Sequence, residues 1–313
     1  MARVTRFGLL TFQHQPWPAL VDEWRVAAEM GFDHVWLPDH FAPSDSPSTP
    51  WFECWTALAA LGACTKGVRL GAMVSSITLR SPAILARQAL TVDHISAGRL
   101  ELGIGGGGAP LDYAMTGNGP WLALERIERL EETVQIVDGL LRTGAATHRG
   151  SHYSIEGAVM RPAPVQQPRP PIILAAHGRR SLALTARMAD GWNSLGYRAS
   201  TGRFKAGQQV RLSDFVRETA EMSAELDELT AAAGRPPDAV RRTVTLLQHT
   251  RALSSVGAFE DVVGRYHAAG IDEFVVYRPG FLLEPAEAAR QLAVMDRVAA
   301  ELPRLRAQFV RPA

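Results

Sequence analysis

Short apolar runs alternate along the chain with longer helix-forming stretches of mixed polarity. The short runs are rich in Val, Ile, Phe and Trp, which favours buried strands. We expect strands near 5–12, 33–38, 68–75, 99–104, 171–175, 190–194, 241–248 and 271–277. We expect helices near 18–30, 53–64, 81–96, 122–142, 179–189, 212–233, 257–268 and 284–300. The pattern therefore predicts eight strands that alternate with eight helices.

Single glycines mark the joints between these elements. A helix-forming stretch, one glycine and a short apolar run recur at Gly31, Gly67, Gly98, Gly191 and Gly270. A glycine just past a helix end suits the left-handed conformation that only glycine takes without steric cost. A strand that follows at once implies a short helix-to-strand loop, so the joints predict repeated βα units and a parallel sheet.

This alternation suits a (β/α)8 TIM barrel over 1–313 better than an open doubly wound sheet. The open sheet would have a Gly-x-Gly-x-x-Gly turn after its first strand, and residues 10–16 contain no glycine. We therefore predict one barrel domain with insertions near 105–121, 143–170 and 195–211. The proline cluster in 143–170 predicts an irregular strap, because proline lacks the backbone donor that a sheet needs.

Composition narrows the class of protein. The chain has 313 residues, 33 Lys+Arg, 32 Asp+Glu and a net charge of +1, so nothing favours nucleic acid or an anionic membrane as a partner. Cys54 and Cys64 are too few for a disulfide framework, and no Cys/His spacing resembles a metal site. No apolar run is long enough to span a membrane, and no signal peptide is evident. We expect a cytoplasmic enzyme that acts on a small molecule.

Three strand ends carry candidate chemistry, because a barrel enzyme has its active site at the C-terminal ends of its strands. After 33–38 come Asp39 and His40, and His40 could exchange a proton near neutral pH or be satisfied by local backbone bonds. The similar pair Asp93-His94 lies at a helix end, where a structural role is favoured. After 99–104 comes the run Gly105–Gly108, a bare backbone that lets a flat or bulky group approach, unless it is a flexible linker.

The third strand end predicts an anion site. Strand 171–175 leads into Ala175-Ala176-His177-Gly178-Arg179-Arg180-Ser181 at a helix start. Backbone amides at a helix start, beside two guanidinium groups, suit a phosphate. The alternative is a solvated arginine pair with Ser181 as an ordinary N-cap. Trp51, Phe52, Trp55 and Trp121 suggest either an aromatic pocket mouth or plain core packing.

Taken together, these residues resemble the bacterial luciferase-like superfamily of flavin- and coenzyme F420-dependent oxidoreductases. The resemblance runs from residue 5 to about 280. Its marks are Ala28–Trp36, Asp39-His40-Phe41, Arg69-Leu70-Gly71, Arg80-Ser81-Pro82, Thr91–Leu100, Gly103-Ile104-Gly105 and Ala189–Trp192. It implies an interrupted TIM barrel, a cofactor ring across the strand C-termini and a homodimer.

The resemblance also implies roles for individual residues. Met73-Val74 matches the position of a non-prolyl cis peptide that backs the ring, and Ser76 matches a polar residue near it. Asp39 and His40 match a pair beside the reactive ring face, with His40 catalytic. From the bare backbone of the glycine run, we also expect Gly106 and Gly107 to contact the cofactor. The cofactor's phosphate is held by Ala175, Ala176, Gly178, Arg179, Arg180 and Ser181.

Two departures from the family pattern bear on substrate and cofactor. The F420-dependent sugar-phosphate dehydrogenases carry a glutamate where this chain has Gly108, so we do not expect a sugar phosphate as substrate. The luciferases carry a phosphate-contacting arginine where this chain has Gly106, and Arg179 and Arg180 could supply that charge instead. The Asp39-His40-Phe41 form resembles the F420 branch more than the luciferase branch.

We therefore expect an F420-dependent oxidoreductase that transfers a hydride between the deazaflavin ring and a small organic substrate. The first alternative is an FMN-dependent luciferase-like monooxygenase. The second is a non-catalytic flavin-binding protein, which the missing acid at Gly108 permits and the retained Asp39-His40 pair opposes. A weaker third is a sugar-phosphate barrel enzyme without a redox cofactor.

Overall fold

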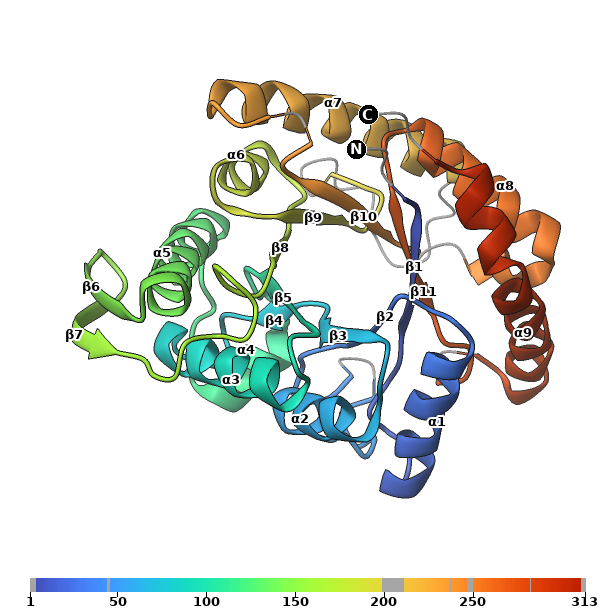
Figure 1. Ribbon diagram of the computed structural model, residues 1–313, viewed down its shortest axis with the longest axis horizontal. Coiled ribbons are helices and arrows are strands. Elements are labelled where there is room, and N and C mark those ends of the chain that lie inside the picture. The colour runs from blue at the N-terminus through green and yellow to red at the C-terminus, as the bar shows by residue number, and fades with distance from the viewer. Residues whose placement is uncertain are drawn as a thin grey trace. The chain divides into compact units, whose positions relative to one another are not determined.

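The computed structural model describes residues 4–43, 46–198, 211–236, 238–246, 250–281 and 283–310. Within these residues, nine strands form one sheet, and β6 (Ala145–Arg149) and β7 (Ser154–Val159) form a separate two-stranded sheet. Strands of the large sheet alternate with helices along the chain (Figure 1). The fold is the predicted (β/α)8 barrel. The predicted elements begin within about two residues of their expected positions, but the last helix, α9 (Pro285–Gln308), ends at Gln308 and not near residue 300.

The described chain divides into two compact units, and the expectation of one domain over 1–313 stays a prediction. The first unit comprises Met1–Thr11, Val26–Val35 and Ala175–Ala313, and the second comprises Phe12–Arg25 and Trp36–Leu174. The elements α1 (Trp17–Glu29), β2 (His34–Leu37) and β8 (Ile172–Ala175) each contain a boundary between these ranges.

In the first unit, four parallel strands lie side by side in the order β1 (Arg6–Leu10), β11 (Glu273–Tyr277), β10 (Arg241–Thr245) and β9 (Gly191–Ser194). Its other elements are α6 (Arg179–Met188), α7 (Leu212–Ala232), η2 (Thr250–Ser254), α8 (Val256–Ala268) and α9. Strand β11 lies between β1 and β10, with Phe7 opposite Phe274, and β10 pairs in turn with β9. The rings of Phe7 and Phe274 stack at 5.8 Å in the core.

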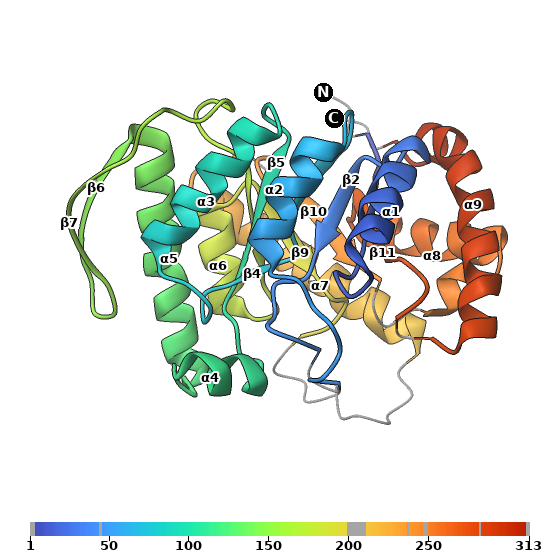
Figure 2. The same ribbon diagram turned by 90° about the horizontal axis from the view of Figure 1, so that it is seen from below.

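In the second unit, β5 pairs in parallel with β3, β4 and β8. Its elements are α2 (Cys54–Cys64), β3 (Arg69–Ala72), β4 (Ser75–Ser76), α3 (Pro82–Ile95), β5 (Leu100–Gly105), α4 (Pro110–Thr116), α5 (Ala123–Thr143), β6 and β7. Helices α2, α3 and α5 cover these strands, and α4 lies near the first turns of α5 (Figure 2). The predicted strand 68–75 is interrupted after Ala72 and resumes at Ser75.

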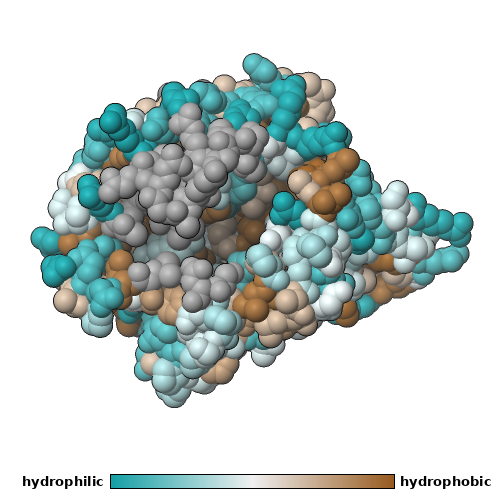
Figure 3. All heavy atoms as spheres, turned by 180° about the vertical axis from the view of Figure 1, so that it is seen from behind, coloured by the Kyte–Doolittle hydropathy of each residue, from teal (hydrophilic) through white to brown (hydrophobic). Residues whose placement is uncertain are grey.

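The insertion at 143–170 is only partly the irregular strap that we expected. Its first part is the antiparallel hairpin β6–β7, and only the proline-rich part that follows is irregular. The hairpin escaped prediction because no face of it is buried, so it lacks the alternation of apolar residues that marks a half-buried strand. Figure 3 shows its projecting end as hydrophilic. Residues 199–210 of the insertion at 195–211 lie outside the described residues.

The glycine joints are confirmed at four of their five positions. Gly31, Gly67, Gly98 and Gly270 have φ of +80°, +76°, +79° and +102°, as the helix-end conformation requires. Gly191 instead begins β9. The loop after β5 also differs from expectation, because it contains the short helix α4, which proline starts and Gly117 ends at φ +70°.

Candidate active site

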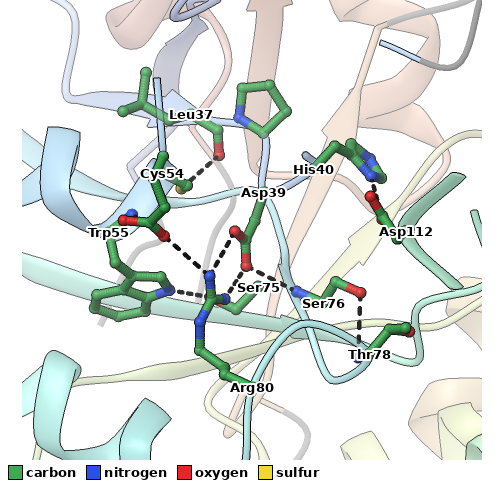
Figure 4. Close-up of polar contacts among 12 residues, drawn as sticks. Leu37, Asp39, His40, Cys54, Trp55, Ser75, Ser76, Thr78, Arg80 and Asp112 are labelled. Carbon is green, nitrogen blue, oxygen red and sulfur yellow. Dashed lines mark hydrogen bonds and ion pairs between the residues drawn. The ribbon is translucent and has the colours of Figure 1, made fainter. Parts of the chain in front are cut away.

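A buried ion pair fixes the turn that follows β2. Asp39 is 2% exposed, and its carboxylate accepts hydrogen bonds from both terminal nitrogens of Arg80 (Figure 4). The distance from Nη2 to Oδ1 is 2.9 Å. The Ser76 amide also donates to Asp39 at 3.1 Å, and Arg80 contacts Glu53, the N-cap of α2, at 3.1 Å. Burial raises the pKa of Asp39, and the Arg80 guanidinium opposes that rise. The carboxylate is thus engaged within the protein, where it holds the backbone beside His40.

His40 is oriented by an acid that the sequence did not reveal. Its Nδ1 lies 2.8 Å from Oδ2 of Asp112 on α4, whose Oδ1 accepts the Phe41 amide at 3.1 Å (Figure 4). The side chain of Asp112 is 1% exposed and that of His40 is 46% exposed. Burial lowers the pKa of His40, but the hydrogen bond and charge of Asp112 outweigh burial, so the pKa is raised. With Nδ1 held by Asp112, Nε2 is the atom that can exchange a proton with a bound molecule.

The segment between β3 and β4 contains the peptide bond that the resemblance singled out. The Met73-Val74 peptide bond is cis, as the resemblance implied. The amide of Met73 donates to the Leu37 carbonyl at 2.9 Å, which ties this segment to β2. Ser76 is buried, and its hydroxyl accepts the Thr78 amide at 3.3 Å.

The glycines after β5 pack closely against neighbouring side chains, so that two of these positions have no room for a side chain. A Cβ on Gly107, where φ is +65°, would lie 2.2 Å from the Thr78 hydroxyl and 3.0 Å from that of Ser76. A Cβ on Gly108, where φ is +124°, would lie 2.1 Å from Nη1 of Arg126, which donates to the Gly107 carbonyl. A guanidinium therefore fills the space that a side chain at position 108 would enter. Gly106 has only ordinary contacts in the same direction.

In the first unit, β8 ends at the predicted phosphate loop. The Ser181 hydroxyl accepts the Gly178 amide at 3.3 Å and donates to the Gly178 carbonyl at 2.9 Å, so it caps the start of α6. Arg179 is paired with Glu225 of α7 at 2.8 Å, whereas Arg180 is exposed. Ala175 ends β8, and the buried Ala176 donates to the Asn193 carbonyl at 3.2 Å. The positive charge expected here is partly offset by Glu225.

His177, which precedes this helix start, is a further candidate that the sequence did not single out. Its ring stacks on Tyr197 at 5.6 Å with an interplanar angle of 10°. Burial lowers the pKa of His177 to about 4, so the ring is neutral at physiological pH. A neutral stacked imidazole offers a flat surface and hydrogen-bonding nitrogens without a charge.

Other candidate residues have structural roles. Asp93 accepts the amides of Val165 and Gln166, and His94 lies 2.8 Å from the Ala163 carbonyl, so this pair holds the proline-rich strap, as expected. Trp55 is buried and donates to Ser75 at 3.1 Å. Among the described residues there is no group of three His, Cys, Asp or Glu side chains that could hold a metal. The described helices include none long and apolar enough to cross a membrane.

Comparison with known proteins shows to which family this chain belongs. The profile of the luciferase-like monooxygenases matches residues 5–256. The chain belongs to this family. An F420-dependent glucose-6-phosphate dehydrogenase of Microbacterium testaceum is 35% identical over 191 residues, or 60% of this chain and 55% of that protein. One from Gordonia bronchialis is 32% identical over 226 residues, or 71% of this chain and 64% of that protein. The matches thus span between about half and two thirds of these relatives' length.

Among solved structures, this luciferase-like chain is similar to an F420-dependent secondary alcohol dehydrogenase in complex with an F420-acetone adduct. The TM-score is 0.75 at 18% identity, and the match covers 94% of this chain and 98% of that chain. At this identity the likeness shows the fold. It agrees with the (β/α)8 barrel predicted from the sequence.

Proposed function

We propose that this luciferase-like protein is a coenzyme F420-dependent oxidoreductase that transfers a hydride between the deazaflavin ring and a small organic substrate. The observation that carries the proposal is the His40–Asp112 pair: a half-exposed imidazole at the end of β2, held by a buried carboxylate. The relatives and the structural neighbour that are named as F420-dependent support the choice of cofactor. Homodimer assembly, which the resemblance implies, stays a prediction.

The residues of each unit fit a flat, anionic cofactor. In the second unit, Gly106 and Gly107 present backbone without side chains beside Ser76, and we assign these residues with Asp39, His40, Met73 and Val74 to the ring. In the first unit, a Cβ on Gly178 would meet nothing within 4 Å, which leaves open space in front of the first turn of α6. We assign Ala175, Ala176, Gly178, Arg179, Arg180 and Ser181 to the phosphate.

In this proposal, His40 exchanges the proton, and Asp112 and Asp39 hold His40 in position. F420, when bound, supplies a ring that accepts or donates a hydride. His40 exchanges the accompanying proton through Nε2, because Asp112 occupies Nδ1 and stabilises the protonated ring. Asp39 has no proton-transfer role in this proposal, because its carboxylate accepts hydrogen bonds from Arg80 and the Ser76 amide. It is locked by Arg80 and fixes the backbone from which His40 projects.

Side-by-side titration of the purified protein with F420 and FMN tests the cofactor. We expect saturable quenching of F420 fluorescence and no binding of FMN at the same concentrations. Arg180→Ala removes a charge-assisted contact to phosphate and should weaken F420 binding about tenfold. Arg187→Ala, at the other end of α6, is the matched control and should bind as the wild type does. Saturable FMN binding without F420 binding would overturn the assignment.

The proton-transfer role has its own test. His40→Ala should lower turnover of reduced F420 with a panel of aldehydes, ketones and enones by about 10²–10⁴-fold, measured at saturating F420. His94→Ala removes the histidine of the other Asp-His pair, which holds the strap, and should leave turnover unchanged. Turnover of the His40 variant within twofold of wild type would refute the assignment.

A second candidate is an FMN-dependent luciferase-like monooxygenase, which the description of the family favours. It predicts that reduced FMN binds and that oxygen is consumed in the presence of substrate. The two cofactor titrations above distinguish it from the main proposal.

A further inference from the structure

Helix α4 holds the acid that orients His40, yet it is too short to hold its own position. It has seven residues, about two turns, and isolated helices of this length are unstable in water. Asp112 on its first turn contacts His40 and Phe41. The position of this acid therefore depends on what packs against the rest of α4.

The next residue, Tyr113, faces a stack of aromatic and cationic groups. Its ring meets Trp121 edge-to-face at 5.7 Å, and a Cβ on Gly119 would lie 2.5 Å from the same ring. The Tyr113 side chain is 8% exposed, and its hydroxyl has no hydrogen-bond partner among the described residues. The ring contacts, rather than a polar anchor, thus fix this face of α4.

Trp121 is held in turn by a cation on α5. The guanidinium of Arg129 lies over the Trp121 ring at 4.3 Å from its centroid, and over the Tyr153 ring at 5.8 Å. Glu125, one turn earlier on α5, pairs with Arg129 at 2.8 Å and orients it. A guanidinium over an indole face is a favourable and directional contact.

The same stack reaches the β6–β7 hairpin. Glu132 on α5 accepts the amides of Ser151, His152 and Tyr153 at 2.8 to 3.2 Å, which fastens the hairpin turn to the helix. Tyr153 is thereby placed against Arg129. The contacts form a continuous path within the second unit, from the hairpin turn through Arg129, Trp121 and Tyr113 to Asp112.

We propose that Arg129 is a positioning residue for His40, acting through Trp121 and Tyr113 on the helix that carries Asp112. The proposal deepens the proposed function and rests on it for the role of His40. The proposal also gives the β6–β7 hairpin a structural role, because Tyr153 at its turn packs against the Arg129 guanidinium. The charged groups that bear on His40 are Asp112 and Asp39, and only Asp112 lies on α4.

The test is an NMR titration of the histidine ring protons in the full chain without cofactor. Arg129→Met keeps the length of the side chain and removes its charge, so α4 should loosen and the pKa of His40 should fall toward the value measured for Asp112→Asn. Trp121→Leu removes the ring but keeps the Arg129–Glu125 pair, and should have the same effect. Arg129→Lys retains a cation over the indole and should restore much of the wild-type curve.

Arg142→Met is the matched control, since Arg142 also pairs with an acid one turn earlier on α5, Asp138 at 2.9 Å. Its His40 titration should overlay that of the wild type. Curves for both Arg129→Met and Trp121→Leu that overlay the wild-type curve would overturn the proposal. Should Arg129→Met fail to fold, Trp121→Leu alone decides. Because no cofactor is present, the result does not depend on F420 binding, which the titration above tests separately.

Discussion

At the scale of single residues, His40 is governed by two opposing effects. Burial disfavours the charged imidazolium, whereas the hydrogen bond and charge of Asp112, together with the charge of Asp39, favour it and outweigh burial. The raised pKa means that protonated His40 contributes stability that is fully present below its ordinary pKa of about 6.5. That contribution is lost as the pH rises through the raised pKa of the folded chain.

Asp112→Asn should therefore move the pKa of His40 from above its ordinary value to below it, because burial remains when the charge is gone. Histidine NMR titration measures this shift. The variant should also lose more stability at pH 6 than at pH 8.5, measured by urea unfolding. Asp138→Asn, an acid on α5 with no contact to His40, is the control. A titration curve unchanged by Asp112→Asn would show that Asp112 does not set this pKa.

Sequence reasoning found one partner of this pair and missed the other. His40 was identifiable because it directly follows a predicted strand. Asp112 lies 72 positions away on a short helix without a clear apolar period, so only the fold brings it to His40. The same limit applies to Arg179: its charge was evident, but its pairing with Glu225, 46 positions later, was not.

At the scale of elements, the Asp39–Arg80 pair joins three of them. Asp39 follows β2, Ser76 belongs to β4, and Glu53 is the N-cap of α2. The Asp39 carboxylate and the Arg80 guanidinium therefore connect β2, β4 and α2. The side chains of Arg80 and Asp39 are 9% and 2% exposed. Removal of one member of such a pair lowers the free energy of unfolding strongly, because the other member is left charged and buried without a partner.

Arg80→Leu should lower the free energy of unfolding by about 3–5 kcal/mol, the cost of a buried charge without its partner. Urea denaturation measures the loss. Arg142→Leu breaks an exposed pair on α5 and should change stability by less than about 0.5 kcal/mol. If the two variants differ by less than about 1 kcal/mol, Arg80 does not hold these elements together in the way described.

Element prediction succeeded where burial imposes a pattern and failed where it does not. The strands that lie in the sheet carry dense apolar residues and glycine joints, and the sequence located them. Helix α4 is too short to show a helical period, and the β6–β7 hairpin is largely exposed and shows no alternation of apolar residues. The proline-rich part of 143–170 was correctly expected to be irregular, because proline removes backbone donors.

At the scale of the whole molecule, the sequence predicted the barrel, and its expectation of one domain over 1–313 stays a prediction. The residues that surround His40 belong to the second unit, and the start of α6 belongs to the first. The family assignment and the barrel agree with the prediction.

The pairing of β1 with β11 also sets the order of events during synthesis. Arg6 of β1 lies opposite Glu273 of β11 and bonds to it across 267 positions. Translation at about 5–20 residues per second places roughly 13–53 s between the emergence of the two strands. Throughout that interval β1 has this edge unpaired and its Phe7 lacks the ring of Phe274. The nascent chain thus presents an apolar strand edge without its pairing partner until the last strand appears.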